Sequence, residues 1–74
     1  MPENNFVTIQ LNGVECFLNK NATVLDAIQS LKPASEFVAA ELNGNILEKL
    51  TFSSTFLKNG DVLEIIQPLG GGNR

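Results

Sequence analysis

Hydrophobic and polar residues alternate over the first twenty residues in a pattern that predicts a β-hairpin. Two segments, residues 6–11 and 14–18, each place every second residue on one face. The pair Asn12-Gly13 lies between them and is the dipeptide favoured in a type I′ hairpin turn. The residues predicted to share the apolar face are Val7, Ile9 and Leu11 in the first strand, and Val14, Cys16 and Leu18 in the second.

The next hydrophobic pattern has a helical period and begins at a capping signal. Thr23 is a good N-cap residue, and Asp26 follows three positions later, as in a capping box. Apolar residues then recur at helical spacing, at Val24, Ala27, Ile28 and Leu31. Pro33 disfavours helical geometry in the residue before it, so we expect the helix to end near Lys32.

Three further strands are predicted in the second half of the chain. Residues 37–42 form the third strand, Asn43-Gly44 a second tight turn, and residues 46–47 a short fourth strand. We expect residues 48–56 to be irregular, with Leu50, Phe52, Phe56 and Leu57 available to cover the open end of the core. A turn at residues 59–61 leads into the last strand, residues 62–67.

The resulting element order, β-β-α-β-β-β, predicts an α+β fold in which a mixed sheet of about five strands packs on one helix. This pattern is similar to the ubiquitin-like β-grasp. We expect a monomer with a globular domain over residues 1–69 and a flexible glycine-rich tail over residues 70–74. The predicted core comprises Val7, Ile9, Leu11, Cys16, Leu18, Val24, Ile28, Leu31, Leu42, Leu63 and Ile65, with Phe52 and Phe56 as further candidates.

Composition excludes several classes of function. With five Lys and Arg against eight Asp and Glu, and a net charge of -3, the chain has no basic patch for nucleic acid. It contains no histidine, which excludes a His-based triad or a His metal site. The single cysteine, Cys16, is interpreted as a buried structural thiol. No membrane-spanning stretch or signal peptide is apparent, so we expect a cytoplasmic protein without a membrane partner.

The chain ends in three glycines, Gly70, Gly71 and Gly72, followed by Asn73 and Arg74. A glycine run has no side chains to bury, so it does not belong to a packed core. One interpretation is a frayed terminus. The other is a thread that enters the active site of a partner, where a Cβ atom would clash.

The chain as a whole resembles the ThiS family of bacterial sulfur carriers, over residues 7–72. The similarity lies in Leu11-Asn12-Gly13, Thr23-Val24, Leu42-Asn43-Gly44, Asn59-Gly60-Asp61 and the terminal Gly71-Gly72. The resemblance implies a protein without enzymatic activity or bound cofactor. A partner, an E1-like adenylating enzyme of the ThiF/MoeB type, uses ATP and Mg²⁺ to activate the carboxylate of Gly72. A persulfide then supplies sulfur, and the thiocarboxylate passes it to an acceptor such as thiazole synthase in thiamine biosynthesis.

The residues Asn73 and Arg74 depart from the family pattern, which ends at the second glycine. Some relatives carry such an extension, and a JAMM-type protease removes it. Those relatives serve cysteine, homocysteine, methionine or specialised thiocarboxylate pathways, so these remain alternatives to thiamine. The small subunit of molybdopterin synthase shares the fold and tail, but it carries Pro-Pro near the end, where this chain has only Pro68.

Strand parity also indicates a surface for docking to partners. Phe6, Phe17, Ile66 and Leu69 fall on the face opposite the core stripe. They are either scattered surface residues or a docking patch that leads to the tail. The alternative function is a ubiquitin-like interaction domain with an inert tail, and activation of the tail by ATP separates the two.

Overall fold

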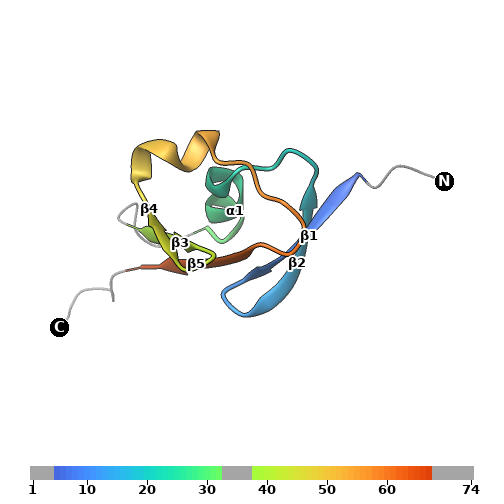
Figure 1. Cartoon of the computed structure of the whole chain (residues 1–74), viewed down its shortest axis with the longest axis horizontal. Helices are drawn as coiled ribbons and strands as arrows, with labels where there is room; N and C mark the ends of the chain where they lie inside the picture. Colours follow the sequence, from blue (N-terminus) through green and yellow to red (C-terminus); the bar gives the residue numbers. More distant parts are fainter. Residues whose placement is uncertain (1–4, 33–37, 68–74) are drawn as a thin grey trace.

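The protein is a five-stranded mixed sheet with one helix packed on one face (Figure 1). The computed structural model describes residues 5–32 and 38–67. The strands are β1 (Phe6–Leu11), β2 (Val14–Asn19), β3 (Ala39–Leu42), β4 (Asn45–Leu47) and β5 (Val62–Ile66). The helix α1 spans Val24–Ser30, and a 3₁₀ helix, η1, spans Lys49–Ser54. The predicted α+β architecture is confirmed.

The sheet has the order β2-β1-β5-β3-β4, so the last strand of the chain lies in the centre. β1 pairs antiparallel with β2 and parallel with β5, while β3 pairs antiparallel with both β4 and β5. Leu63 is fully buried and Ile65 is also part of the core, on a strand that has neighbours on both sides. The parallel pairing of β1 and β5 is short, since it joins only Gln10 to Val62 and Leu11 to Leu63.

The helix begins as its sequence predicts. The Thr23 hydroxyl accepts a hydrogen bond from the Asp26 N–H (3.2 Å), and the Asp26 carboxylate accepts one from the Thr23 N–H (2.9 Å). These reciprocal bonds satisfy two donors that the first helical turn leaves unpaired. The helix is short, and Leu31 is its C-cap residue.

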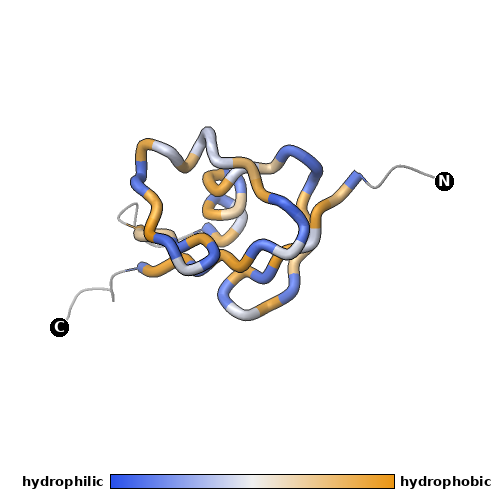
Figure 2. Tube along the Cα trace, in the orientation of Figure 1, coloured by the Kyte–Doolittle hydropathy of each residue, from blue (hydrophilic) through white to orange (hydrophobic). Residues whose placement is uncertain are grey.

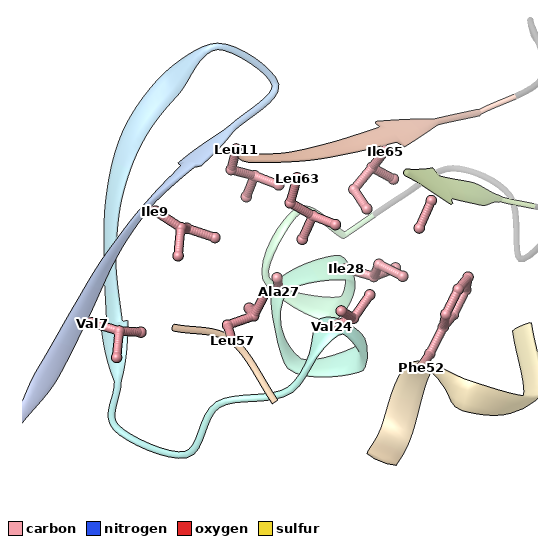
Figure 3. Close-up of a cluster of buried hydrophobic side chains, with 11 residues drawn as sticks. Val7, Ile9, Leu11, Val24, Ala27, Ile28, Phe52, Leu57, Leu63 and Ile65 are labelled. Atoms are coloured by element: carbon pink, nitrogen blue, oxygen red, sulfur yellow. The ribbon is translucent and has the colours of Figure 1, made fainter. Parts of the chain in front are cut away.

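The core fills the space between α1 and the inner face of the sheet (Figure 3). Alternation is visible along the strands, where hydrophobic and polar positions succeed one another (Figure 2). Seven predicted core residues are buried, while Cys16, Leu18 and Leu42 are half-buried and pack against the cluster. The full buried cluster is Val7, Ile9, Leu11, Val24, Ala27, Ile28, Ala40, Phe52, Leu57, Leu63 and Ile65.

Three predicted positions differ from the structure for identifiable reasons. Leu31 is exposed because α1 ends at Ser30, before the helical stripe reaches this residue. Phe56 is exposed because the chain is extended there, and its neighbour Leu57 points inward instead. Cys16 is only half-buried because β2 is an edge strand, and Val14 beside the turn of the same strand is exposed.

The segment predicted to be irregular contains a regular element. Residues Lys49–Ser54 form η1, which packs against α1 and places Phe52 in the core. Hydroxyl groups stabilise this short helix: Thr51 Oγ1 donates to the Glu48 carbonyl (2.6 Å) and Thr55 Oγ1 donates to the Thr51 carbonyl (2.7 Å). The expectation that this segment covers the core is confirmed for Phe52 and Leu57, whereas Leu50 is almost fully exposed.

Both hairpin turns have the backbone that their Asn-Gly pairs predict. Asn12 and Asn43 each have a φ of 52°, and the following Gly13 and Gly44 have φ values of 83° and 87°. Positive φ at both central positions defines a type I′ turn and explains why glycine occupies the second.

The two turn asparagines also hold β5 through their side chains. The Ile65 N–H donates to Asn12 Oδ1 (2.7 Å), and the Val62 N–H donates to Asn43 Oδ1 (2.9 Å). The backbone N–H groups of the same asparagines donate to the carbonyls of Leu63 (2.9 Å) and Val62 (2.8 Å). Each asparagine therefore continues the ladder of hydrogen bonds at the point where its own backbone turns away from β5.

Asn43 also contacts the buried Asp61. Its Nδ2 donates to Asp61 Oδ1 (3.0 Å), and Asp61 Oδ2 accepts from the Lys58 N–H (2.8 Å). Asp61 is the buried charged residue of the described part of the chain, and these bonds compensate for its removal from water.

We predict that Asn43→Asp destabilises the fold more than Asn12→Asp. An aspartate at either position keeps the acceptor for β5, but the Asn43→Asp change would place a second carboxylate against buried Asp61. Leaving a buried polar group against a repelling partner costs about 1–3 kcal/mol, so the melting temperature should fall by roughly 5–15 °C.

The matched variant Asn12→Asp should lose less than about 1 kcal/mol, because its Oδ1 bond to Ile65 survives. Thermal unfolding followed by circular dichroism measures both. Equal losses for the two variants would show that the contact between Asn43 and Asp61 contributes little.

Candidate docking face and C-terminal tail

Among the residues that the structure describes, no helix covers the outer face of the sheet, because α1 and η1 both lie on the inner side (Figure 1); we call this the open face. Along β5 the residues alternate, so Leu63 and Ile65 enter the core while Val62, Glu64 and Ile66 point outward. The central strand therefore supplies both the core and the middle of the open face, and it is the last described element before the C-terminal tail.

Three exposed aliphatic residues lie on the open face around β5: Val62 and Ile66 at the two ends of this strand, and Ile46 on β4. Val62 is 40%, Ile66 53% and Ile46 67% exposed. Ile46 lies opposite Glu41 in the β3–β4 pair, and Glu41 lies opposite Glu64 in the β3–β5 pair. We call these five residues, Glu41, Ile46, Val62, Glu64 and Ile66, the tail-side face.

A second apolar cluster lies on the β1–β2 hairpin. Phe6 is 52% and Phe17 67% exposed. Phe17 pairs with Thr8, and Phe6 with Asn19, so the two rings are diagonal neighbours on the open face at roughly 7–8 Å. We call this pair the hairpin cluster.

The two clusters share a face without being contiguous. Phe17 lies opposite Thr8 of β1, and Gln10 of β1 lies opposite Val62 of β5. The distance along the strands from Phe17 to Ile66 is therefore two residues on β1 plus four on β5, or roughly 20 Å at ~3.3 Å per residue. A shallow depression of about 380 Å³ lies between them, lined by Thr8, Ile9, Gln10, Glu15, Asn59, Gly60 and Val62.

The predicted docking residues thus have mixed outcomes. Phe6, Phe17 and Ile66 are exposed, and strand alternation places them on one face, as predicted. They form two separate clusters and not one patch. Leu69, the three glycines at 70–72, Asn73 and Arg74 lie outside the described residues.

Ile46 and Val62, which share the open face with Ile66, were not among the predicted docking residues. Val62 has the same strand parity as Ile66, which the sequence alone shows. Ile46 could be placed from the two-residue turn at Asn43-Gly44, because this turn fixes Glu41 opposite Ile46.

Residues 5–32 and 38–67 contain no group of three or more His, Cys, Asp or Glu positioned to hold a metal ion. Within the same ranges, no helix has the length and apolar character needed to cross a membrane.

Comparison with known proteins gives the same class of protein as the fold. The sequence model of the ThiS family matches residues 5–72. The chain is 38% identical over 66 residues to the uncharacterized protein ycf40 of Pyropia yezoensis, covering 89% of this chain and 93% of that protein. It is 32% identical over 69 residues to the uncharacterized protein ycf40 of Porphyra purpurea, covering 93% and 97%.

Solved structures of a thiamine biosynthesis protein (ThiS) from Geobacter metallireducens are also similar. The crystal structure superposes with a TM-score of 0.73 at 33% identity, over 89% of this chain and 100% of that chain. The solution NMR structure gives a TM-score of 0.73 at 32% identity, over 92% of this chain and 91% of that chain.

Fold and comparisons together define a small ubiquitin-like protein of the sulfur-carrier type. The chain belongs to the ThiS family, whose model covers it almost end to end. Members of this family are non-catalytic carriers that interact with E1-like enzymes.

We predict that charged substitutions on the open face leave the fold nearly intact. Ile66→Lys and Phe17→Lys should each change the free energy of unfolding by less than about 1 kcal/mol, since both side chains are more than half exposed. Phe52→Ala, in contrast, removes a buried ring and should cost about 3–5 kcal/mol. Urea denaturation of the three variants measures the difference, and unfolding of either Lys variant would identify that position as part of the core.

Proposed function

We propose that this chain is a sulfur carrier that bears sulfur as a thiocarboxylate on Gly72. The observation that carries the proposal is the match to the ThiS family over residues 5–72, which ends at the second glycine of Gly71-Gly72. Both thiamine biosynthesis structures share this fold at more than 30% identity.

The proposed reaction has two stages on a partner enzyme of the E1-like class, with ATP and Mg²⁺ bound by that enzyme. The Gly72 carboxylate oxygen attacks the α-phosphorus of ATP, and pyrophosphate leaves. A persulfide sulfur then attacks the carbonyl carbon and displaces AMP. A thiol cleaves the resulting sulfur–sulfur bond and leaves the thiocarboxylate on Gly72.

Adenylation is needed because a carboxylate is a poor electrophile, whereas AMP is a good leaving group. The glycines suit a thread that enters a recessed site, since they carry no Cβ atom. Three extended residues reach about 10 Å. Gly70 and Gly71 would therefore carry the reacting carboxylate away from the globular domain.

The residues after Gly72 require a further step. Gly72 is followed by Asn73, so the Gly72 carbonyl is locked in a peptide bond and this residue has no free carboxylate. We propose that a protease of the JAMM type removes Asn73-Arg74 before activation.

We propose thiamine biosynthesis, with thiazole synthase as sulfur acceptor, as the pathway, because the similar solved structures are described as thiamine biosynthesis proteins. Carriers that are trimmed for cysteine, homocysteine or methionine synthesis are the alternative that the Asn73-Arg74 extension favours. An E1-like partner would dock on the open face, with Ile66 near the tail and the hairpin cluster, Phe6 and Phe17, farther away. Leu69, three residues after Ile66 in the sequence, is proposed as a further contact.

We predict that a chain ending at Gly72 gains sulfur and the full chain does not. The truncated chain should be adenylated by the cognate E1-like enzyme and then acquire sulfur in place of one oxygen. The full chain should require the protease, because Arg74 is long and charged where the family has a glycine terminus. Intact-mass spectrometry after incubation with enzyme, ATP and a sulfur source detects both products.

Two results would contradict this function. Equal thiocarboxylation of the full chain and the truncated chain would rule out trimming. Absence of any modification on either chain would favour the ubiquitin-like interaction domain with an inert tail. Gly71→Ala in the truncated chain is the matched control: it should reduce activation strongly and leave the melting temperature unchanged.

A further inference from the structure

Two glutamates occupy directly opposed positions on the tail-side face. Glu41 of β3 lies directly opposite Glu64 of β5, and strand alternation points both outward. Directly opposed residues on one face have Cβ atoms about 5 Å apart, and like charges at that spacing destabilise the strand pair.

Nothing in the described part of the chain offsets this repulsion. Over residues 5–32 and 38–67, no hydrogen bond or ion pair is formed by the side chain of Glu41 or Glu64. The sequence therefore retains an unfavourable pair in the centre of the sheet, with one member on β5, the strand on which the core depends. Stability lost at an exposed position in this way is typical of a surface selected for function.

The surroundings of the pair are apolar. Ile46 lies opposite Glu41 on the side away from Glu64. Val62 and Ile66 lie two residues before and after Glu64 on the same face of β5. All three aliphatic side chains are at least 40% exposed. The tail-side face thus combines exposed apolar surface with two adjacent negative charges at its centre.

We propose that the tail-side face binds a partner protein that places a lysine or arginine side chain between Glu41 and Glu64. Apolar side chains around that cation would cover Ile46, Val62 and Ile66. The inference rests on the proposed function and names the chemistry of the partner surface. A guanidinium or ammonium group would remove the repulsion on binding, so the pair favours the complex over the free carrier.

The position of the face on β5 favours the tail-activating enzyme as this partner. Glu64 and Ile66 belong to the strand that leads directly into the C-terminal residues. A protein bound there holds the start of the tail, which raises the effective concentration of the terminal carboxylate at the partner's active site.

The test uses the full-length chain and the E1-like adenylating enzyme encoded in the same genome, titrated by calorimetry. The double variant Glu41→Gln/Glu64→Gln should weaken binding roughly tenfold or more. The same variant should raise the melting temperature by about 1–5 °C, because it removes a like-charge pair. If the two glutamates had only a structural role, the double variant would not raise the melting temperature while weakening binding.

Glu15→Gln is the matched control, because Glu15 lies on the same open face of the sheet but opposite the neutral Gln10. It should change Kd by less than about twofold, since an exposed charge without a facing partner contributes little to affinity. Raising NaCl from ~50 to ~300 mM should weaken wild-type binding more than binding of the double variant.

Two outcomes would overturn the inference while the carrier function stands. Kd of the double variant could equal that of the wild type, or Glu15→Gln could weaken binding as much as the double variant does. In either case the Gly72-ending wild-type chain would still be adenylated. Failure of the wild-type chain both to bind and to be adenylated would instead overturn the proposed function, and this inference with it.

Discussion

The structure depends on how β5 is held in the middle of the sheet. Its parallel pairing with β1 joins only two residues on each strand, which is little for a central strand. The side chains of Asn12 and Asn43 extend this pairing, since each accepts an N–H of β5 just where the neighbouring strand turns away. Asn59 acts in the same way on β1, by accepting the Thr8 N–H at 2.7 Å. Asparagine side chains from three Asn-Gly turns thus tie the central strands β1 and β5 into the sheet.

Because β5 is held so firmly, one strand can serve three purposes. Its inward residues, Leu63 and Ile65, complete the core against α1. Its outward residues, Val62, Glu64 and Ile66, form much of the tail-side face. Its end continues into the residues that carry the proposed chemistry. A partner that binds this strand therefore contacts residues that directly precede the tail in the sequence, on a strand that has neighbours on both sides.

Local signals in the sequence predicted most of this fold. Hydrophobic alternation located β1, β2 and β5, and the Thr23–Asp26 capping box located α1, because these elements are determined by near neighbours along the chain. Positions that depend on distant neighbours were predicted less well. The burial of Leu31 and Phe56 depends on where α1 and η1 end in space, and the separation of Phe17 from Ile66 depends on the register of β1 with β5. Strand alternation predicts which face of the sheet a residue lies on, whereas the register between strands determines which residues on that face lie close together.

The residues on the open face also bear on how partner proteins can recognise one carrier of this type among several. A short glycine tail has no side chains by which proteins could tell one carrier from another, so discrimination must come from the globular domain. The fold is shared with the thiamine biosynthesis protein of Geobacter metallireducens, so partners cannot tell carriers apart by the fold alone. What remains are the side chains on the open face, where a charged pair among aliphatic residues admits a partner with complementary charge and penalises one without it. Under the proposed function, recognition by the activating enzyme should therefore depend on the outward residues of β3, β4 and β5 more than on the core or the glycines.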